Sequence, residues 1–587
     1  MRKSKGNTFV IFVILIVAWI AIYLLRILYL DSDIPNYGVL FYQQVDEGPY
    51  GYLALNELNY GCINPDYNVT SVNQYTAPHL RTNIVGNFFI WITMKIFGDT
   101  YYGYRMSSVF CMLFNYILIF LILIYINKNY CQNCKQSKLY LLLIFGCLTF
   151  DFSYFNAARI VETSIYRMLF ILLVITLFFY IKKESFFKYV LLGFLVIFSV
   201  FGIYITNVFL VVSFGLFFIY RFCKGDKKKN LRCILGFSIG GGIALLLCEC
   251  YMRYFWKTGI VENTLKIIDN FSGIGGYIET GTANRFTYFL DFFGNSFNLY
   301  NPILFALTLL ALPIVIGYAV KKRDDYIVLV FCMYISFFLQ TMYSEDYIIR
   351  KYIVITPAVI IMIYYLLTHF TDIIQSWGRV KKAIYILYIT IISCFIIFVD
   401  LYRLKFIEDK SNLDFSWLDK RVIIILSLIL TGAFMYLSVI YILKNKFSLR
   451  IMFITYVLMT FINIYMITEH NFRNLTFADR NIMIEMNNID LPDKYIIGNY
   501  MISFTLYNKY VSVANYYDDM ENMLLKNKNW LYFDYSTNWD PQAEIYIESI
   551  IKNPEYHLVM YREFKREKST LGVVRNVALY KLEKIEN

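Results

Sequence analysis

The stretch TFVIFVILIVAWIAIYLLRILYL, from Thr8 to Leu30, decides the class of fold. A helix needs roughly 20 consecutive, mostly apolar residues to cross the hydrocarbon core of a bilayer, and this run meets that length. It begins within ten residues of Met1 and has no cleavage site made of small residues. The run therefore predicts a retained membrane-spanning helix rather than a removed signal peptide.

Similar runs recur along the chain. It has 587 residues, of which 58% are hydrophobic and 19% aromatic, with a mean hydropathy of +0.50. Soluble domains are closer to half apolar and lack repeated runs of this length. The sequence predicts an α-helical polytopic membrane protein with about thirteen transmembrane helices, near 8–30, 104–127, 138–156, 160–181, 187–203, 207–221, 232–254, 302–320, 326–342, 350–369, 382–401, 421–443 and 449–468.

Lysine and arginine in the short connections predict the orientation, because cytoplasmic loops carry the excess of basic residues. The stretch 31–103 holds only Arg81 and Lys95 against seven Asp and Glu, so it is expected outside. The net charge of +12 is spread over these short loops and does not indicate a nucleic-acid partner. We expect a multi-pass plasma-membrane protein with a cytoplasmic N-terminus and an extracytoplasmic C-terminus. The basic connections are 2–5, 128–138, 182–183, 224–232, 321–323, 379–382 and 444–450.

Two domains are predicted, a membrane domain over 1–469 and a small extracytoplasmic α/β domain over 470–587. The second lacks long apolar runs; strands are expected at 495–498, 511–514, 530–533 and 572–582, and helices at 520–526 and 541–551. In the first loop, 84–97 is too short to span comfortably and predicts a helix lying in the interface. The sequence shows no repeats and no inverted halves, which counts against a transporter.

Two adjacent carboxylates, Asp46 and Glu47, follow the first span in the run Val45 to Tyr52. On the predicted orientation they lie outside, beside the membrane surface. A carboxylate there could take a proton from a reacting group. The alternative is an ordinary solvated loop.

Basic residues gather on the same predicted side. Arg159 and Glu162 are three apart and share a helix face, so they could act on a substrate or form an ion pair that fixes a helix end. Arg350 and Lys351 could hold a phosphate or extend to the interface from a helix end. Further members are His79 and Arg81, in the run Pro78-His79-Leu80-Arg81. Proton-accepting carboxylates beside phosphate-binding cations predict transfer with a phosphate leaving group. Glu249 and Arg253, four apart near an outer helix end, are expected to pair structurally.

The order of these motifs resembles a family. Asp46-Glu47-Gly-Pro-Tyr50, then Ala77-Pro78-His79-Leu80, then Lys95-Ile96-Phe97-Gly98 and Tyr104-Arg105-Met106 follow the pattern of the GT-C fold membrane glycosyltransferases. Among these the chain is most similar to the protein O-mannosyltransferases and the ArnT-like lipid A aminoarabinose transferases. Arg159-Ile-Val-Glu162 and the run from Arg350 to Pro357 resemble two later motifs. The chain departs from the pattern in two places. His79 stands where the aminoarabinose transferases have a basic residue before paired prolines, and here only Pro78 is present; the insertion 62–75 also lengthens the first loop.

The resemblance implies an inverting glycosyltransferase that moves a sugar from a polyprenyl-phosphate donor to an acceptor hydroxyl on the outer face. Asp46 would be the general base, and Glu47 would position the acceptor or a cation. Glu162 would orient Arg159 or the sugar. The residues implied in substrate binding are Tyr50, His79, Arg81, Arg159, Arg350 and Lys351. The acceptor could be a glycan, a lipid or a protein, and membrane lipids are expected partners.

A cofactor is not required by the sequence. Four His and scattered Cys, including Cys131 and Cys134 with no second pair, argue against a zinc site. Any divalent cation would more readily be Mg²⁺ or Mn²⁺ than Zn²⁺, held by Asp46 and Glu47. The rival functions are a lipid or solute transporter or flippase, a phosphoethanolamine-type transferase, which needs a metal-binding domain, and an inactive scaffold.

Overall fold

The computed structural model describes a large part of the chain. The described residues are 17, 19–32, 54, 81–130, 137–161, 163–182, 184–225, 227–274, 302–322, 324–343, 353–375, 377–408, 419–443, 463–464, 467–473, 475, 477–490, 495–498, 511–514, 521, 524–525, 530–534, 551–564 and 577–585.

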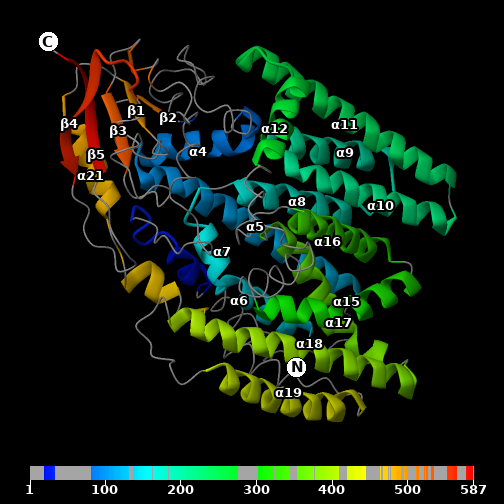
Figure 1. Cartoon of the computed structure of the whole chain (residues 1–587). Helices are drawn as coiled ribbons and strands as arrows, with labels where there is room; N and C mark the ends of the chain where they lie inside the picture. Colours follow the sequence, from blue (N-terminus) through cyan, green and yellow to red (C-terminus); the bar gives the residue numbers. More distant parts are fainter. Residues whose placement is uncertain are drawn as a thin grey trace.

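Helices dominate the first 443 residues (Figure 1). They are α4 (Ile84–Phe97), α5 (Tyr101–Tyr130), α6 (Ser137–Thr149), α7 (Phe152–Ala157), α8 (Thr163–Tyr180), α9 (Phe186–Gly202), η3 (Ile205–Asn207), α10 (Val208–Lys224), α11 (Lys227–Trp256), α12 (Ile260–Ile274), α15 (Pro302–Lys322), α16 (Asp325–Tyr343), α17 (Thr356–Gln375), α18 (Arg379–Glu408) and α19 (Lys420–Leu443). Most coincide with a predicted span to within a few residues, and α4 has the bounds expected for the short helix of the first loop. The predicted span 449–468 lies almost wholly outside the described residues.

Within the described residues, four helices are long and apolar enough to cross a membrane: 101–129, 163–180, 205–224 and 227–256. Shorter apolar helices occur at 84–97, 186–202, 325–340, 353–369 and 421–433. The helical membrane character of the chain is therefore confirmed, while the count of thirteen stays a prediction.

The predicted span 138–156 is two helices rather than one. α6 ends at Thr149, and the Asp151 side chain accepts a hydrogen bond from the Tyr154 backbone N–H at 2.9 Å, which caps α7. An Asp at this position satisfies a backbone donor that the first turn of a helix leaves free. Asp151 is 1% exposed, so the break lies inside the protein.

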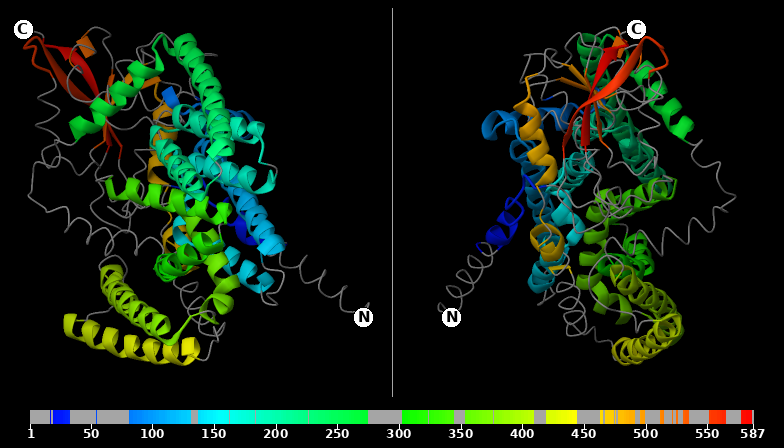
Figure 2. Two further views of the ribbon diagram at one scale, coloured as in Figure 1. Left: turned by 90° about the vertical axis from the view of Figure 1, so that its right-hand side faces the viewer. Right: turned by 60° about the vertical axis from the view of Figure 1, so that its left-hand side comes forward.

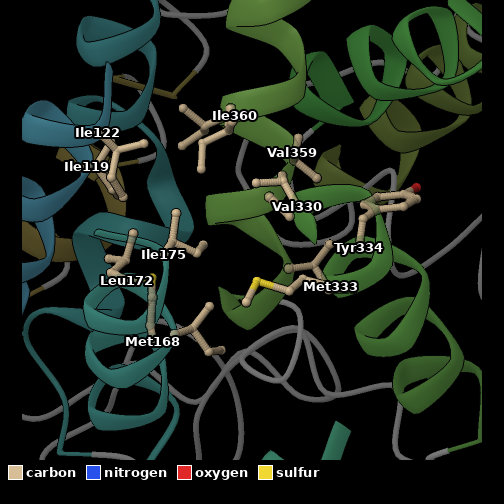
Figure 3. Packing of buried hydrophobic residues seen from close by; sticks show 14 of the residues in the cluster. Ile119, Ile122, Met168, Leu172, Ile175, Val330, Met333, Tyr334, Val359 and Ile360 are labelled. Carbon is tan, nitrogen blue, oxygen red and sulfur yellow. The ribbon is translucent and has the colours of Figure 1, made fainter. Parts of the chain in front are cut away.

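The core lies between α5, α8, α16 and α17 (Figure 3). Ile122 of α5 and Leu172 of α8 face Val330 of α16 and Ile360 of α17, and all four are fully buried. Methionine and branched aliphatic side chains fill the space between the four helices. This core fixes the helices whose ends carry the polar clusters described below.

α9 and α11 approach through glycines. A Cβ on Gly240 would lie 1.8 Å from the carbonyl oxygen of Val190, and one on Gly193 would lie 2.0 Å from that of Phe237. Small residues allow such close contact between membrane helices. α18 and α19 also pack side by side (Figure 2).

The tail forms a five-stranded sheet at one end of the helical part (Figures 1 and 2). The strands are β1 (Tyr495–Gly498), β2 (Val511–Ala514), β3 (Trp530–Asp534), β4 (Tyr556–Phe564) and β5 (Val577–Lys584), in the order β2-β1-β3-β5-β4. β1 pairs parallel with β2 and β3, whereas β5 pairs antiparallel with β3 and β4. η7 (Glu469–Arg473) and α21 (Ala478–Asn487) precede the sheet.

Three strands have the predicted positions, and β4 was not predicted. The last predicted strand, 572–582, is confirmed from Val577 onward, and its first five residues lie outside the described residues. The helix expected at 520–526 is described only at residues 521, 524 and 525, which are helical. The helix expected at 541–551 lies outside the described residues except for its last residue. The domain boundary at 470 stays a prediction.

Candidate outer-face site

The end of the first span is held by two buried arginines. Residues 19–24 are helical, and turns follow as far as residue 31. Arg159, between α7 and α8, donates from Nη1 to the carbonyl oxygens of Arg26 at 3.1 Å and Leu28 at 2.7 Å, and from Nη2 to that of Tyr29 at 2.9 Å. The last carbonyls of a helix lack partners within it, so Arg159 satisfies the end of this span. The dark-blue first span accordingly lies beside α7 (Figure 1).

Arg105 of α5 completes this arrangement. Its Nη1 donates to the carbonyl oxygens of Leu30 at 2.8 Å and Ser32 at 2.5 Å. Arg105 is 1% exposed and Arg159 is 5% exposed. The two guanidinium groups therefore fix the backbone from which the loop carrying Asp46 and Glu47 departs.

These contacts change the reading of Arg159. Sequence reasoning placed it on a substrate phosphate, with Glu162 as its partner; Glu162 lies outside the described residues. The structure directs its guanidinium to backbone carbonyls, and contact with a substrate phosphate stays a prediction. Burial lowers the pKa of Arg159 to about 9, with the charges of Arg105 and Arg26 acting in the same direction and Asp31 opposing them. The group still carries its charge at neutral pH.

Arg26, a third buried arginine, lies at the same end of the span. Its Nη2 donates to the Tyr116 hydroxyl at 3.1 Å and to the Thr149 carbonyl at 2.8 Å. Its guanidinium carbon lies 5.0 Å from the centre of the Tyr23 ring and 4.9 Å from that of Phe155, within the range of cation–π attraction. Sequence reasoning gave Arg26 no role, although a charge within an apolar span is itself a signal.

The end of the span also contacts the tail. Asp31 forms an ion pair with Arg480 of α21, with Oδ2 and Nη1 2.9 Å apart. Both side chains are partly exposed, so the pair contributes little stability by itself. The pair places α21 of the tail beside the end of the first span.

Arg81 has a different environment from Arg159. It is 7% exposed, and its guanidinium carbon lies 5.5 Å from the centre of the Trp256 ring at the end of α11. Burial lowers the pKa of Arg81, and the negative charge of Glu262 on α12 opposes that shift. Within the described residues, Arg81 lies over a ring and forms no hydrogen bond to a helix end, whereas Arg105 and Arg159 do.

Unpaired donors surround Arg81. Within the described part of the chain, no hydrogen-bond acceptor reaches the buried Arg81 Nε or the Asn83 Nδ2. Asn83 itself caps α4, accepting from the Gly86 N–H at 3.2 Å. Buried donors normally find partners. A cation with free donors and an aromatic face suits an anionic oxygen ligand such as a phosphate.

The end of α11, which carries Trp256, contains the ion pair between Glu249 and Arg253 that the sequence predicted. Arg253 and Glu249 pair through Nε and Oε1 at 2.5 Å. Glu249 also accepts from the Ile260 backbone N–H at 2.7 Å, which joins the end of α11 to the start of α12. Trp256 is thereby held between two connected helices.

The remaining predicted site residues lie outside the described residues. They are Asp46, Glu47, Tyr50, His79, Glu162, Arg350 and Lys351. Of the predicted set, the structure places Arg81 and Arg159 and does not bring their guanidinium groups into contact with each other. Among the described residues, no group of three or more His, Cys, Asp and Glu could hold a metal ion. A cation at Asp46 and Glu47 stays a prediction.

Solved structures share this fold over nearly the whole chain. ArnT from Cupriavidus metallidurans in the apo state matches with a TM-score of 0.51 and 11% identity, covering 98% of each chain. ArnT from the same organism bound to undecaprenyl phosphate matches with a TM-score of 0.50 and 10% identity, covering 97% of each chain. No family model and no curated protein matches the sequence. The ArnT-like fold implied by the sequence resemblance is therefore confirmed.

Proposed function

We propose that this protein is an inverting glycosyltransferase that uses a polyprenyl-phosphate-linked sugar on the outer face of the plasma membrane. The observation that carries the proposal is the fold shared with ArnT over 97% of both chains, in a structure that contains undecaprenyl phosphate. The acceptor hydroxyl belongs to a glycan, a lipid or a protein.

In the proposed reaction, Asp46 removes the proton of the acceptor hydroxyl. The acceptor oxygen then forms a bond to the anomeric carbon of the sugar from the face opposite the phosphate. The bond between that carbon and the phosphate oxygen breaks, and polyprenyl phosphate leaves with the electron pair. Glu47 positions the acceptor; if a divalent cation were bound, Asp46 and Glu47 would hold it and it would supply positive charge beside the reacting groups. Tyr50 binds the substrate, and Glu162 orients Arg159 or the sugar.

The leaving phosphate needs cations. Arg81 is the favoured described candidate, because it is buried against Trp256 and its Nε lacks an acceptor within the described residues. His79, Arg350 and Lys351 are the further candidates. Arg159 contributes indirectly, because its donors hold the end of the first span. Its positive charge still favours an anion nearby.

The proposal is tested with purified protein in proteoliposomes supplied with radiolabelled polyprenyl-phosphate sugars and an envelope extract as acceptor. General-base assistance contributes roughly 10²–10⁴-fold, so Asp46→Asn should lower transfer by that factor. The matched control is Asp99→Asn, which removes an exposed carboxylate between α4 and α5 and should leave transfer unchanged. Mass spectrometry of envelope glycans from a deletion strain would identify the acceptor class.

Two outcomes would count against the proposal. If a folded Asp46→Asn protein keeps wild-type turnover, Asp46 is not the base. If the wild-type protein moves the lipid-linked sugar across the bilayer without consuming it, the chain is a flippase or transporter instead.

A further inference from the structure

A second polar site lies at the other end of the helices. A cavity of about 530 Å³ opens between the ends of α8, α10, α15 and α16 and the later turns of α17. These helix ends adjoin the basic connections, so the charge pattern places the cavity on the cytoplasmic side. In Figure 1 the connection between α10 and α11 lies on the side away from the sheet. The cavity is therefore separate from the proposed transfer site.

The carboxylates that line this cavity are already engaged. Glu184 accepts from Lys188 at 3.1 Å, Arg221 at 2.9 Å and the Tyr189 hydroxyl at 2.8 Å. Asp325 pairs with Lys224, with Oδ1 and Nζ 2.6 Å apart, and lies 3.7 Å from Arg221 Nε.

Asp324, the third carboxylate of the lining, caps the start of α16. It accepts from the Tyr326 backbone N–H at 3.1 Å and from that of Ile327 at 3.4 Å. No carboxylate of the lining is therefore left to attract a cation. The cavity is not a metal site.

Two lysines of the lining have weak internal contacts. Lys182 Nζ reaches the Asn129 side-chain oxygen only at 3.4 Å and the centre of the Tyr125 ring at 5.9 Å. Lys322 Nζ lies 5.6 Å from the centre of the Tyr318 ring, and within the described residues it has no hydrogen-bond or ion-pair partner. Both ammonium groups keep donors for a ligand, because each has three. Two further cations, Lys188 and Arg221, contact the carboxylates of the lining. Counted together with Lys182, Lys224 and Lys322, they give the surroundings of the cavity more positive than negative charge.

The walls are aromatic. Tyr318, Tyr326 and Tyr365 line the cavity, together with Phe178. Tyrosine is favoured at membrane interfaces, where the ring meets lipid and the hydroxyl meets water. A ligand that suits these walls has an anionic head and an adjoining apolar part. Basic pockets between membrane helices on the cytoplasmic side bind acidic lipid headgroups.

We propose that this cavity binds the phosphate of an acidic phospholipid from the cytoplasmic leaflet, held by Lys182 and Lys322. Lysine binds phosphate as a point charge, and two lysines on different helix ends would bridge the α8–α9 connection and α15 through the ligand. The lipid would thereby stabilise the packing of α8, α10 and α16 without taking part in the transfer reaction. A soluble phosphate compound offers the same head chemistry and is separated from the lipid by experiment.

The test uses the full-length protein purified in detergent and stripped of lipid. Phosphatidylglycerol, phosphatidylcholine and inorganic phosphate are added in separate titrations. Binding is followed by the apparent melting temperature and by native mass spectrometry. Phosphatidylglycerol should raise the melting temperature and stay bound, whereas phosphatidylcholine and inorganic phosphate should not. Each lysine near an anionic lipid surface contributes enough that Lys182→Gln/Lys322→Gln should bind phosphatidylglycerol roughly 30-fold more weakly.

The matched control is Lys227→Gln/Lys381→Gln, which removes two exposed lysines outside the cavity at the same side of the protein. It should bind phosphatidylglycerol like the wild type. An unchanged affinity in Lys182→Gln/Lys322→Gln overturns the proposal. Equal stabilisation by inorganic phosphate and phosphatidylglycerol overturns the lipid as the source. If the double variant does not purify as a monodisperse protein, Lys322→Gln alone decides the question by the same comparison.

Discussion

Replacing Gly240 by alanine tests the packing of α9 against α11. The new Cβ would lie 1.8 Å from the carbonyl oxygen of Val190, 2.6 Å from its carbonyl carbon and 2.9 Å from the backbone nitrogen of Phe194. All three atoms are backbone, so no side chain can rotate away. Carbon and oxygen approach to about 3.3–3.6 Å in close helix contacts, so the two helices would have to separate by roughly 1.5 Å.

The cost follows from that separation. Overpacking a tight interior typically costs about 1–3 kcal/mol. Gly242→Ala is the matched control, because nothing lies within 4 Å of a Cβ at Gly242. That substitution should be neutral or stabilising by up to about 1 kcal/mol, since alanine favours a helix more than glycine does.

The assay is thermal unfolding of the two purified variants, followed with a cysteine-reactive dye that reports the exposure of buried thiols such as Cys248 of α11. Gly240→Ala should unfold at a lower temperature than the wild type, and Gly242→Ala at the same or a higher one. Equal melting temperatures for the two variants would refute the close contact between α9 and α11.

Three further predictions concern the polar clusters. Arg81→Gln should raise KM for the lipid-linked donor at least tenfold, because a charged hydrogen bond contributes about 1.5–3 kcal/mol; Arg379→Gln, which removes an exposed arginine at the start of α18, should not. Arg159→Met should destabilise the protein by about 3–5 kcal/mol, measured by thermal unfolding, because it removes a buried cation and leaves backbone carbonyls unpaired; a loss of turnover with unchanged stability would instead favour direct phosphate binding. For Glu184, burial opposes ionisation, but Lys188 and Arg221 outweigh it and lower the pKa below 4.5. This carboxylate therefore contributes stability above pH 4.5 that is lost as the pH falls through the lowered pKa, so the melting temperature of Glu184→Gln should depend less on pH in that range.

Long apolar runs made the helices predictable, because each must satisfy its backbone within the bilayer. α16 and α19 begin and end within one residue of the predicted spans. The break at Asp151 was missed because length alone was used, although an Asp followed by Phe152 and Ser153 offered a capping signal. β4 was missed because YHLVMYREF does not alternate cleanly between apolar and polar residues.

The site was less predictable, because its contacts join distant parts of the chain. Nothing near Arg81 in the sequence indicates that Trp256 lies under its guanidinium. The sequence motif singled out Arg159, but its partners are backbone carbonyls of the first span. Every residue has a backbone carbonyl, so the sequence does not indicate which ones Arg159 contacts. A short pattern can thus select an important residue while leaving its physical role open.

The hold of Arg105 and Arg159 on the first span has a consequence for biogenesis. The carbonyl oxygens of Arg26 and Leu28 receive their donor only after residue 159 has been synthesised and inserted. Until then, carbonyl oxygens at the end of the first helix lack these donors, and the backbone at the start of the following loop is not held by Arg159. A nascent chain that ends before residue 159 would therefore lack the donors that fix the point from which the loop carrying Asp46 and Glu47 begins.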